Sequence, residues 1–344
     1  MLRSTRYQVP SDPEAFLAEM ERRGWSDGLP MIPPTEERVK ACVDASGRGA
    51  DEVVAKLPPT WAEATVEKIA VNAVMAGCRP EYMPILLAAV AATAQEPFNL
   101  YAIQTTTHPC AVLVIVSGPV ASTLGINSGY GAFGPGNRAN ATIGRALRLV
   151  LVNVAGAVPG LLDRATQGTP AKYTFCVAEN EGASPWPSLR LSLGFKAEDS
   201  VVTVVAGEAP HNINDHGSHT ASSLLRQIAS SIAIPGSNNA YMKGDSYLFL
   251  GPEHAQQLAA EGLSREDVQA RVFELARIPR AAFGPGQLAH IEAGLTPAAR
   301  AMAGEALAVG VSPDDLKVLV VGGDGRHSAW VPTFGMTRSC SALI

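Results

Sequence analysis

The stretch AVLVIV at residues 111–116 decides the fold class of this 344-residue chain. It is a short, continuous run of β-branched and aliphatic residues, and Ser117, Gly118 and Pro119 follow it directly. Such runs are typical of strands buried on both faces, because a strand with one wet face alternates apolar and polar residues. We therefore expect a buried strand at this point of the chain.

Similar apolar runs recur downstream, and helical patterns lie between them. The further strands are expected at residues 173–178, 200–206, 247–250 and 317–321. The helices are expected at residues 12–23, 82–93, 140–154, 219–234, 252–261 and 264–277. Thr35 is a plausible N-cap of one more helix. Strands that alternate with helices predict an α/β fold with a mostly parallel sheet and helices on both faces.

Three of these units share a pattern of strand, glycine, acidic residue and histidine. The histidines concerned are His211, His254 and His327. Two interpretations stay open: an internal repeat of strand-loop-helix units, or ordinary glycine turns that carry a histidine by chance. We expect residues 1–60 to form an N-terminal helical arm and residues 61–344 an α/β catalytic domain. A sub-boundary near residue 240 is the alternative division.

Composition narrows the class of protein. Apolar residues make up 47% of the chain and charged residues 17%, which argues against disorder. A formal charge of −5 and the lack of a basic run argue against a nucleic-acid partner. Residues 141–158 are too polar and too few to span a membrane, and no signal peptide is recognisable. Five cysteines without metal-binding spacing fit buried thiols in a reducing cytoplasm.

The glycine-rich loop at residues 125–140 is the most unusual segment. Glycine allows backbone N–H groups to approach a ligand closely, and the helix that follows favours an anion at its N-terminus. We expect the loop to bind the substrate through Asn127, Ser128, Asn137 and Arg138, with the guanidinium as a clamp for a carboxylate or phosphate. The alternative is a structural loop. It is neither a Walker A nor a dinucleotide fingerprint, so no ATP or NAD motif is present.

Polar clusters follow the predicted strands, where parallel sheets place their ligands. Glu179 is a candidate catalytic acid or base, and Asn180 a candidate substrate ligand, at the end of one strand. The densest cluster carries the candidate catalytic residues His211, Asp215 and His216. These three side chains either bind a divalent metal, zinc or iron, or transfer protons.

The sequence gives weaker evidence of a functional role for the other polar residues near the strand ends. Asn212 and His327 are expected to contact the substrate. His108 is expected to cap a strand, His254 to lie in the first turn of a helix, and His219 to lie inside one.

Several of these motifs together resemble a poorly characterised bacterial family. They are DGLP at 27–30 with PPT at 33–35, TTHP at 106–109, FGPGNRANATIG at 133–144, FCVAENE at 175–181 with SPW at 184–186, and PHN…DH at 210–216. Members of that family look like companions of small (seleno)proteins with a Sec/Cys-Gly-Ser-Cys (UGSC) motif. The motif itself is absent here, and Arg338-Ser339-Cys340 resembles it only weakly. The resemblance implies a site at these positions and a link to thiol chemistry, without an assigned reaction.

The function we predict is an enzyme of the lyase or hydrolase kind that acts on a small anionic organic molecule by acid–base, or metal-assisted, bond cleavage or addition. One alternative is a redox subunit that works with a thiol or selenol partner protein through Cys176. The other is a non-catalytic protein that binds an anionic metabolite. We also expect a homodimer or higher oligomer. The reason is the segment at residues 25–35, whose composition suggests that it extends around a neighbouring subunit.

Overall fold

The chain divides into two compact units, and each is described by itself. The computed structural model describes residues 2–240, 242, 244–295 and 304–344. Unit 1 comprises Met1–Glu179, Leu193–Ala206 and Ser339–Ile344, and unit 2 comprises Asn180–Ser192 and Gly207–Arg338. Residues 1–60, expected as a separate arm, belong to unit 1, and residue 240 lies inside unit 2.

Unit 1 contains a four-stranded sheet in the order β12-β5-β3-β4, with β3 and β4 parallel and β12 antiparallel to β5. A hairpin of β1 and β2 lies apart from this sheet. The strands are β1 (Val53–Leu57), β2 (Ala62–Thr65), β3 (Ala111–Ser117), β4 (Cys176–Ala178), β5 (Val201–Gly207) and β12 (Cys340–Leu343). The helices are α1 (Pro13–Arg22), α2 (Glu36–Ala45), α3 (Val66–Ala76), α4 (Met83–Thr93), α5 (Leu100–Thr105), α6 (Pro119–Thr123) and α7 (Arg138–Asn153).

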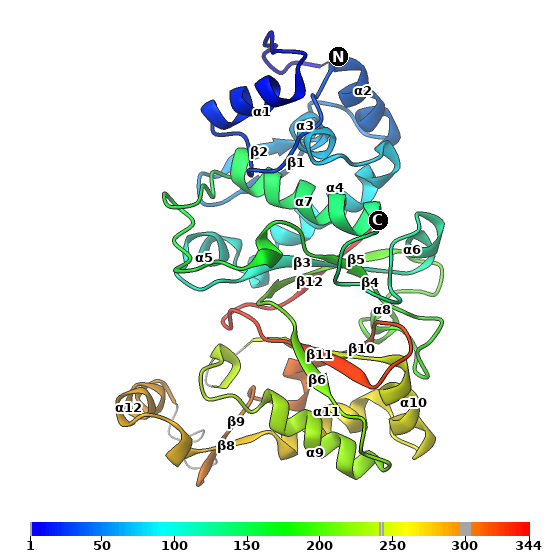
Figure 1. The fold of residues 1–344 in the computed structure, drawn as a ribbon, viewed down its shortest axis with the longest axis vertical. Helices are drawn as coiled ribbons and strands as arrows, with labels where there is room; N and C mark the ends of the chain where they lie inside the picture. The colour runs from blue at the N-terminus through cyan, green and yellow to red at the C-terminus, as the bar shows by residue number, and fades with distance from the viewer. Residues whose placement is uncertain (1, 241, 243, 296–303) are drawn as a thin grey trace. The chain divides into compact units, whose positions relative to one another are not determined.

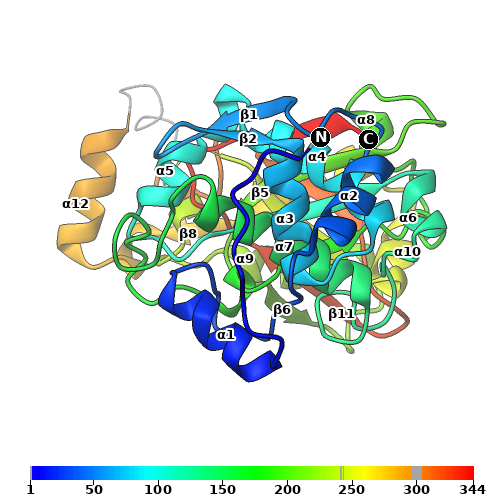
Figure 2. The same ribbon diagram turned by 90° about the horizontal axis from the view of Figure 1, so that it is seen from above.

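Helices α4 and α7 cover one face of the unit 1 sheet, with α3 packed against α7 (Figure 1). Gly144 makes the approach of α7 to the sheet edge close, because a Cβ atom there would lie 2.5 Å from the backbone nitrogen of Phe175. The N-terminal segment runs across α3 before α1 begins (Figure 2). Asp12 caps α1 and Thr35 caps α2, the latter as the sequence predicts.

Unit 2 contains a second four-stranded sheet, in the order β10-β7-β11-β6. Here β10 and β7 are parallel, whereas β11 is antiparallel to both β7 and β6. The strands are β6 (His211–Asn214), β7 (Ser246–Leu250), β8 (Arg277–Pro279), β9 (Ala306–Ala308), β10 (Leu316–Val320) and β11 (His327–Val331). The helices are α8 (Leu189–Ser192), α9 (Ala221–Ile232), α10 (Pro252–Ala260), α11 (Arg265–Leu275) and α12 (Pro285–Gly294).

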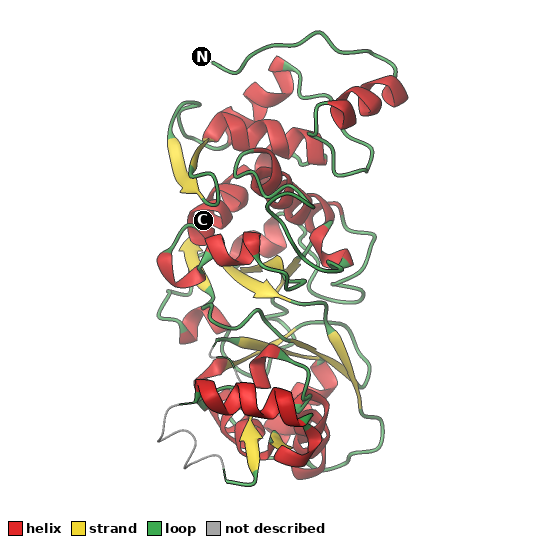
Figure 3. Cartoon of the chain, turned by 90° about the vertical axis from the view of Figure 1, so that its left-hand side faces the viewer, coloured by secondary structure: helices red, strands yellow, loops and turns green. Residues whose placement is uncertain are grey.

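Helices α9 and α11 pack on each other, and they also contact the strands β6 and β10 of the unit 2 sheet. Figure 3 shows the helices of the chain in red and its strands in yellow. The apolar faces of α9 and α11 join Trp330, Leu248 and Val318 from the sheet in one buried core. The short strands β8 and β9 form a separate antiparallel pair.

A mix of helices and open sheets is confirmed, but a mostly parallel sheet is not, since both four-stranded sheets are mixed. The antiparallel members β6, β11 and β12 lack a long apolar run, so their pairing depends on neighbours distant in sequence. The internal repeat is not confirmed either. His211 begins β6, His254 lies in the first turn of α10, and His327 begins β11.

Candidate functional site

Two histidines and an asparagine of unit 2 form a chain of ring and amide contacts. Nε2 of His216 lies 3.3 Å from Nε2 of His327, and the rings meet edge to face with centroids 5.1 Å apart. Nδ1 of His327 lies 3.0 Å from Oδ1 of Asn212. All three residues are exposed to solvent. This His216–His327–Asn212 chain is the candidate site of unit 2.

The strand register brings these residues together. In the antiparallel pair of β6 and β11, His327 lies opposite Asn214 and Ala329 opposite Asn212. Asn212 and Asn214 share one face of β6 because side chains alternate along a strand. His327 therefore reaches Asn212 diagonally across the pair. His216 comes from the turn that follows β6.

The contacts determine the tautomers of the two rings. An amide oxygen only accepts, so Nδ1 of His327 carries a proton and donates it to Asn212 Oδ1. When this ring is neutral, its Nε2 has the lone pair that accepts a hydrogen bond from Nε2 of His216. A proton taken up at Nδ1 of His216 can thus be passed on from its Nε2 to Nε2 of His327, while Asn212 holds the accepting ring in place.

Hydrogen bonds to the buried Asp215 side chain support the turn that carries His216. One carboxylate oxygen of Asp215 accepts from the backbone N–H groups of Gly217 and Ser218, at 3.1 and 2.8 Å. Burial alone would raise the pKa of Asp215, but its bonds to Ser218 and Gly217 outweigh this effect and lower it. The other oxygen, Oδ2, is buried without a hydrogen-bond partner among the described residues. Asp215 therefore shapes the turn.

His254 ties the same turn to β11. Its side chain is fully buried, and its Nδ1 lies 2.8 Å from Ser328 Oγ and its Nε2 3.1 Å from the carbonyl oxygen of Asp215. Burial lowers the pKa of His254, so the neutral ring is favoured. Its expected place in the first turn of a helix is confirmed, and its role is to position its neighbours.

The three expected metal ligands do not come together as a set. His211 and Ile213 share the face of β6 opposite Asn212, because side chains alternate along the strand. Asp215 uses Oδ1 within its own turn. In the described parts of the chain, no three His, Cys, Asp or Glu side chains are arranged to hold a metal ion. His219 was expected inside a helix, but α9 begins at Ala221 and Thr220 caps it.

In unit 1, Glu179 follows β4 directly and is only 3% exposed. Its Oε2 accepts a hydrogen bond of 3.1 Å from the hydroxyl of Ser117, at the end of the parallel strand β3. The two side chains thus lie at the carboxyl ends of neighbouring strands, where α/β sheets place ligands. Sequence reasoning missed Ser117, which looked like part of a turn. Glu179 belongs to unit 1 and His211 to unit 2, so a shared role of these two candidate catalytic residues stays a prediction.

The asparagines of the glycine-rich loop are used within unit 1 itself. Asn137 caps α7 by accepting from the N–H of Asn140, and its Nδ2 donates to Gly125. Asn140 is buried and exchanges two hydrogen bonds with the backbone of Asn127, at 2.8 and 2.9 Å. The loop is therefore held in a fixed conformation, with Ser128 half-buried within it.

The guanidinium of Arg138 is hydrogen-bonded within unit 1. Its Nε and Nη2 both donate to the carbonyl oxygen of Gly77, at 3.0 and 2.9 Å. Gly77 ends α3 in the left-handed conformation, so the fork joins the end of α3 to the start of α7. This contact favours the structural interpretation of Arg138.

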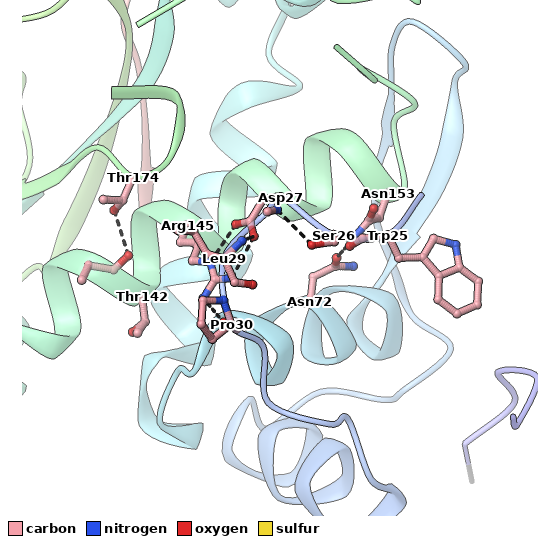
Figure 4. Close-up of polar contacts among 12 residues, drawn as sticks. Trp25, Ser26, Asp27, Leu29, Pro30, Asn72, Thr142, Arg145, Asn153 and Thr174 are labelled. Carbon is pink, nitrogen blue, oxygen red and sulfur yellow. Dashed lines mark hydrogen bonds and ion pairs between the residues drawn. The ribbon is translucent and has the colours of Figure 1, made fainter. Parts of the chain in front are cut away.

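Arg145 anchors the DGLP segment to α7 (Figure 4). Its guanidinium forms two bonds to the Asp27 carboxylate, at 2.7 and 2.8 Å, and also donates to the carbonyl oxygens of Leu29 and Pro30. Asn153 binds the carbonyl oxygen of Trp25 in the same segment. Residues 25–35 therefore dock within their own chain, a contact that no sequence spacing could reveal.

Asn180, Glu181 and His108 each have a partner within their own unit. Asn180 donates through Nδ2 to the carbonyl oxygen of Gly322, and Glu181 pairs with Arg190 through two bonds of 3.0 and 3.1 Å. His108 Nδ1 accepts from the backbone of Cys110 at the start of β3, as expected for a capping residue.

All five cysteines are free and buried, as the sequence predicts. Burial raises the pKa of the Cys176 thiol far above its ordinary value, which disfavours the reactive thiolate. Helices that could cross a membrane are not found in the part of the chain that the structure describes. Comparisons with protein-family models and with curated proteins find no match. The resemblance to the UGSC-associated family stays a prediction.

Proposed function

We propose that this protein is an enzyme that acts on a small organic molecule by acid–base chemistry, with the His216–His327 pair as the proton-transfer group. The single observation that supports this function is the chain of two histidines and an asparagine with defined donor and acceptor roles. A ring that accepts a proton next to a ring that carries one offers a base and an acid at one exposed place.

The expected anionic character of the substrate has lost its main support, because Arg138 is bound to Gly77. We therefore leave the charge of the substrate out of the proposal. The redox alternative has lost support as well, because its contact thiol, Cys176, is buried and kept protonated. Proton transfer that accompanies bond cleavage or addition is the chemistry that one acid and one base can serve.

The test follows proton abstraction directly. The full chain is incubated in D₂O with a panel of small ketones, ketoacids and hydroxyacids, and the loss of C–H signals is followed by ¹H NMR. We expect exchange of the acidic C–H of at least one compound, slowed on the order of 10²–10⁴-fold by His216→Gln or His327→Gln. The control is His219→Gln, which removes an exposed histidine of the same turn from outside the pair.

Two results would refute the acid–base proposal. One is wild-type protein that exchanges no compound of the panel above the buffer rate. The other is exchange that His327→Gln leaves as fast as in the wild type, because the proton-accepting role is assigned to that ring.

A metal-assisted version of this function is favoured by the same geometry. Two imidazole nitrogens that bind one tetrahedral zinc ion at 2.0–2.1 Å are about 3.3–3.4 Å apart, and the two Nε2 atoms are separated by 3.3 Å. The bond from His327 Nδ1 to Asn212 is of the kind that orients metal-binding histidines. Water or substrate would complete the coordination.

Zinc titration separates the two versions. If the metal-assisted version holds, calorimetry of the full chain with ZnCl₂ gives one site per chain, and either His216→Gln or His327→Gln weakens it at least tenfold. His219→Gln should bind zinc like the wild type. Zinc binding that survives the loss of His327 would exclude this pair as the metal site, and the metal-free acid–base version would stand.

A further inference from the structure

Arg326 binds both ends of the turn that carries His216. Its Nε donates to the carbonyl oxygen of Asp215 at 2.8 Å, and its Nη2 donates to the carbonyl oxygen of Ser218 at 2.5 Å. Asp215 and Ser218 are the first and last residues of this turn, and His216 lies between them. All four residues belong to unit 2. One guanidinium therefore spans the stretch of backbone from which the His216 ring extends.

Three oxygen atoms fix the position of this guanidinium. Besides the two carbonyl oxygens of the turn, Oε1 of Gln257 in α10 accepts from Nη2 of Arg326 at 2.7 Å. Arg326 itself is half-buried. A guanidinium is planar, so its donors point in fixed directions and hold acceptors from different elements at set angles. The turn is thus held relative to α10 as well as to the residue that precedes β11.

The backbone of Arg326 is bound to the same turn. The N–H group of Asp215 donates to the carbonyl oxygen of Arg326 at 3.2 Å, which continues the pairing of β6 and β11 by one more contact. His216 follows Asp215 in the chain, and His327 follows Arg326. The two rings therefore extend from residues that come directly after a pair joined twice, once by its backbones and once by the guanidinium.

His254 binds the same carbonyl oxygen from within the core. Its Nε2 lies 3.1 Å from the carbonyl oxygen of Asp215, and its Nδ1 lies 2.8 Å from Oγ of Ser328. The two neighbours of His327 in the chain are thus both linked to Asp215, Arg326 directly and Ser328 through His254. His254 reaches only the first residue of the turn, whereas Arg326 binds its last residue as well. Arg326 therefore makes the wider contact with the turn.

We propose that Arg326 is the positioning residue of the His216–His327 pair. Its fork places the turn so that Nε2 of His216 lies within hydrogen-bond distance of Nε2 of His327. Arg326 acts through the two histidines, because its guanidinium stays protonated and is bound to protein oxygens. The effect of this placement on proton transfer rests on the proposed function, whereas the placement itself does not.

The placement is tested by ¹⁵N NMR of the histidine rings in the full chain, at about pH 8.5, above the ordinary pKa of histidine. The Nε2 signal of His327 reports whether this nitrogen accepts a hydrogen bond. His216→Ala removes the donor and gives the reference signal without that bond. We expect Arg326→Lys to move the signal from its wild-type position toward this reference, because lysine keeps the charge but loses the planar fork. The matched control is Arg226→Lys on an exposed position of α9, which should keep the wild-type signal.

A kinetic cycle tests the effect on proton transfer. On a compound that the wild type exchanges in D₂O, Arg326→Lys should lower kcat on the order of 10²-fold and leave KM nearly unchanged, since a small misplacement of a reacting group has an effect of this size. The same change made in His216→Ala should slow the exchange no further. A rate loss that came only from lower stability would have the same factor in both backgrounds.

Arg326→Gln, which also lacks the fork, replaces Arg326→Lys if circular dichroism shows that the lysine variant does not fold. The proposal is overturned if the His327 signal of the wild type equals that of His216→Ala, if Arg326→Lys keeps the wild-type signal, or if its effect on exchange is the same in both backgrounds. A wild type that exchanges no compound would refute the acid–base function, and the NMR comparison would still decide whether Arg326 places the pair.

Discussion

His254 shows how one residue makes unit 2 sensitive to pH. Burial lowers the pKa of this ring below its ordinary value of 6.5. The unfolded chain therefore binds a proton at a higher pH than the folded chain does. The stability associated with the neutral ring is fully present above pH 6.5, and it is lost as the pH falls from there toward the folded pKa.

We predict that His254→Gln makes the free energy of unfolding less dependent on pH. Urea unfolding at about pH 7.5 and about pH 5.5 measures this dependence. The wild type should lose more stability between the two values than the variant, although the variant is less stable at the higher pH because the ring contacts to Ser328 and Asp215 are changed. His290→Gln controls for the loss of a histidine. Equal losses in wild type and His254→Gln would contradict the assignment.

Arg138 and Arg145 show at the same scale why a charged residue cannot be assigned from its position alone. Arg138 lies in the glycine-rich loop, Arg145 follows it, and both are suited to clamp an anion. In the structure the first binds a helix-terminal carbonyl oxygen, and the second binds Asp27 with side chains only 13% and 12% exposed. A planar guanidinium satisfies several oxygens at once, so structural sites compete with ligands for it.

At the scale of elements, the packing of α7 against the sheet of unit 1 depends on Gly144. A Cβ atom at this position would lie 2.5 Å from Phe175 N and 2.5 Å from Thr174 Oγ1. The backbone nitrogen cannot rotate away as a flexible side chain would. The FGPGNRANATIG motif therefore carries a packing requirement at its last residue.

We predict that Gly144→Ala lowers the free energy of unfolding by about 1–3 kcal/mol, the range for overpacked cores, measured by urea unfolding. The matched control is Gly286→Ala in α12, where an added Cβ atom meets no atom within 4 Å. That change should be neutral or stabilise by up to about 1 kcal/mol, because alanine favours helices. A stability gain in Gly144→Ala would show that helix and strand separate more easily than the geometry implies.

At the scale of the whole molecule, the division into units follows contacts and not chain order. The chain passes from one unit to the other after Glu179, Ser192, Ala206 and Arg338. Both units are therefore assembled from separate stretches of the chain. A division of the sequence at a single linker could not separate the two units. The expected homo-oligomer stays a prediction, while the segment at residues 25–35 that suggested it is docked by Arg145 and Asn153 of its own chain.

The sequence alone determined the mix of helices and sheets, the buried strands β3, β5, β7 and β10, the main helices and the burial of all five cysteines. These features depend on local periodicity and apolar content, which a short window of sequence contains. The sequence also indicated the polar cluster that contains His216, and it indicated His327 separately as a residue that contacts the substrate.

Only the tertiary structure decided the mixed sheets, the partners of Arg138 and Arg145, and the His216–His327–Asn212 chain. His216 and His327 are 111 residues apart, and their contact depends on the antiparallel register of β6 and β11. A register shift of one residue would turn Asn212 to the opposite face of its strand. Pairings of this kind arise from the free energy of the whole packed unit, so no single stretch of residues contains them.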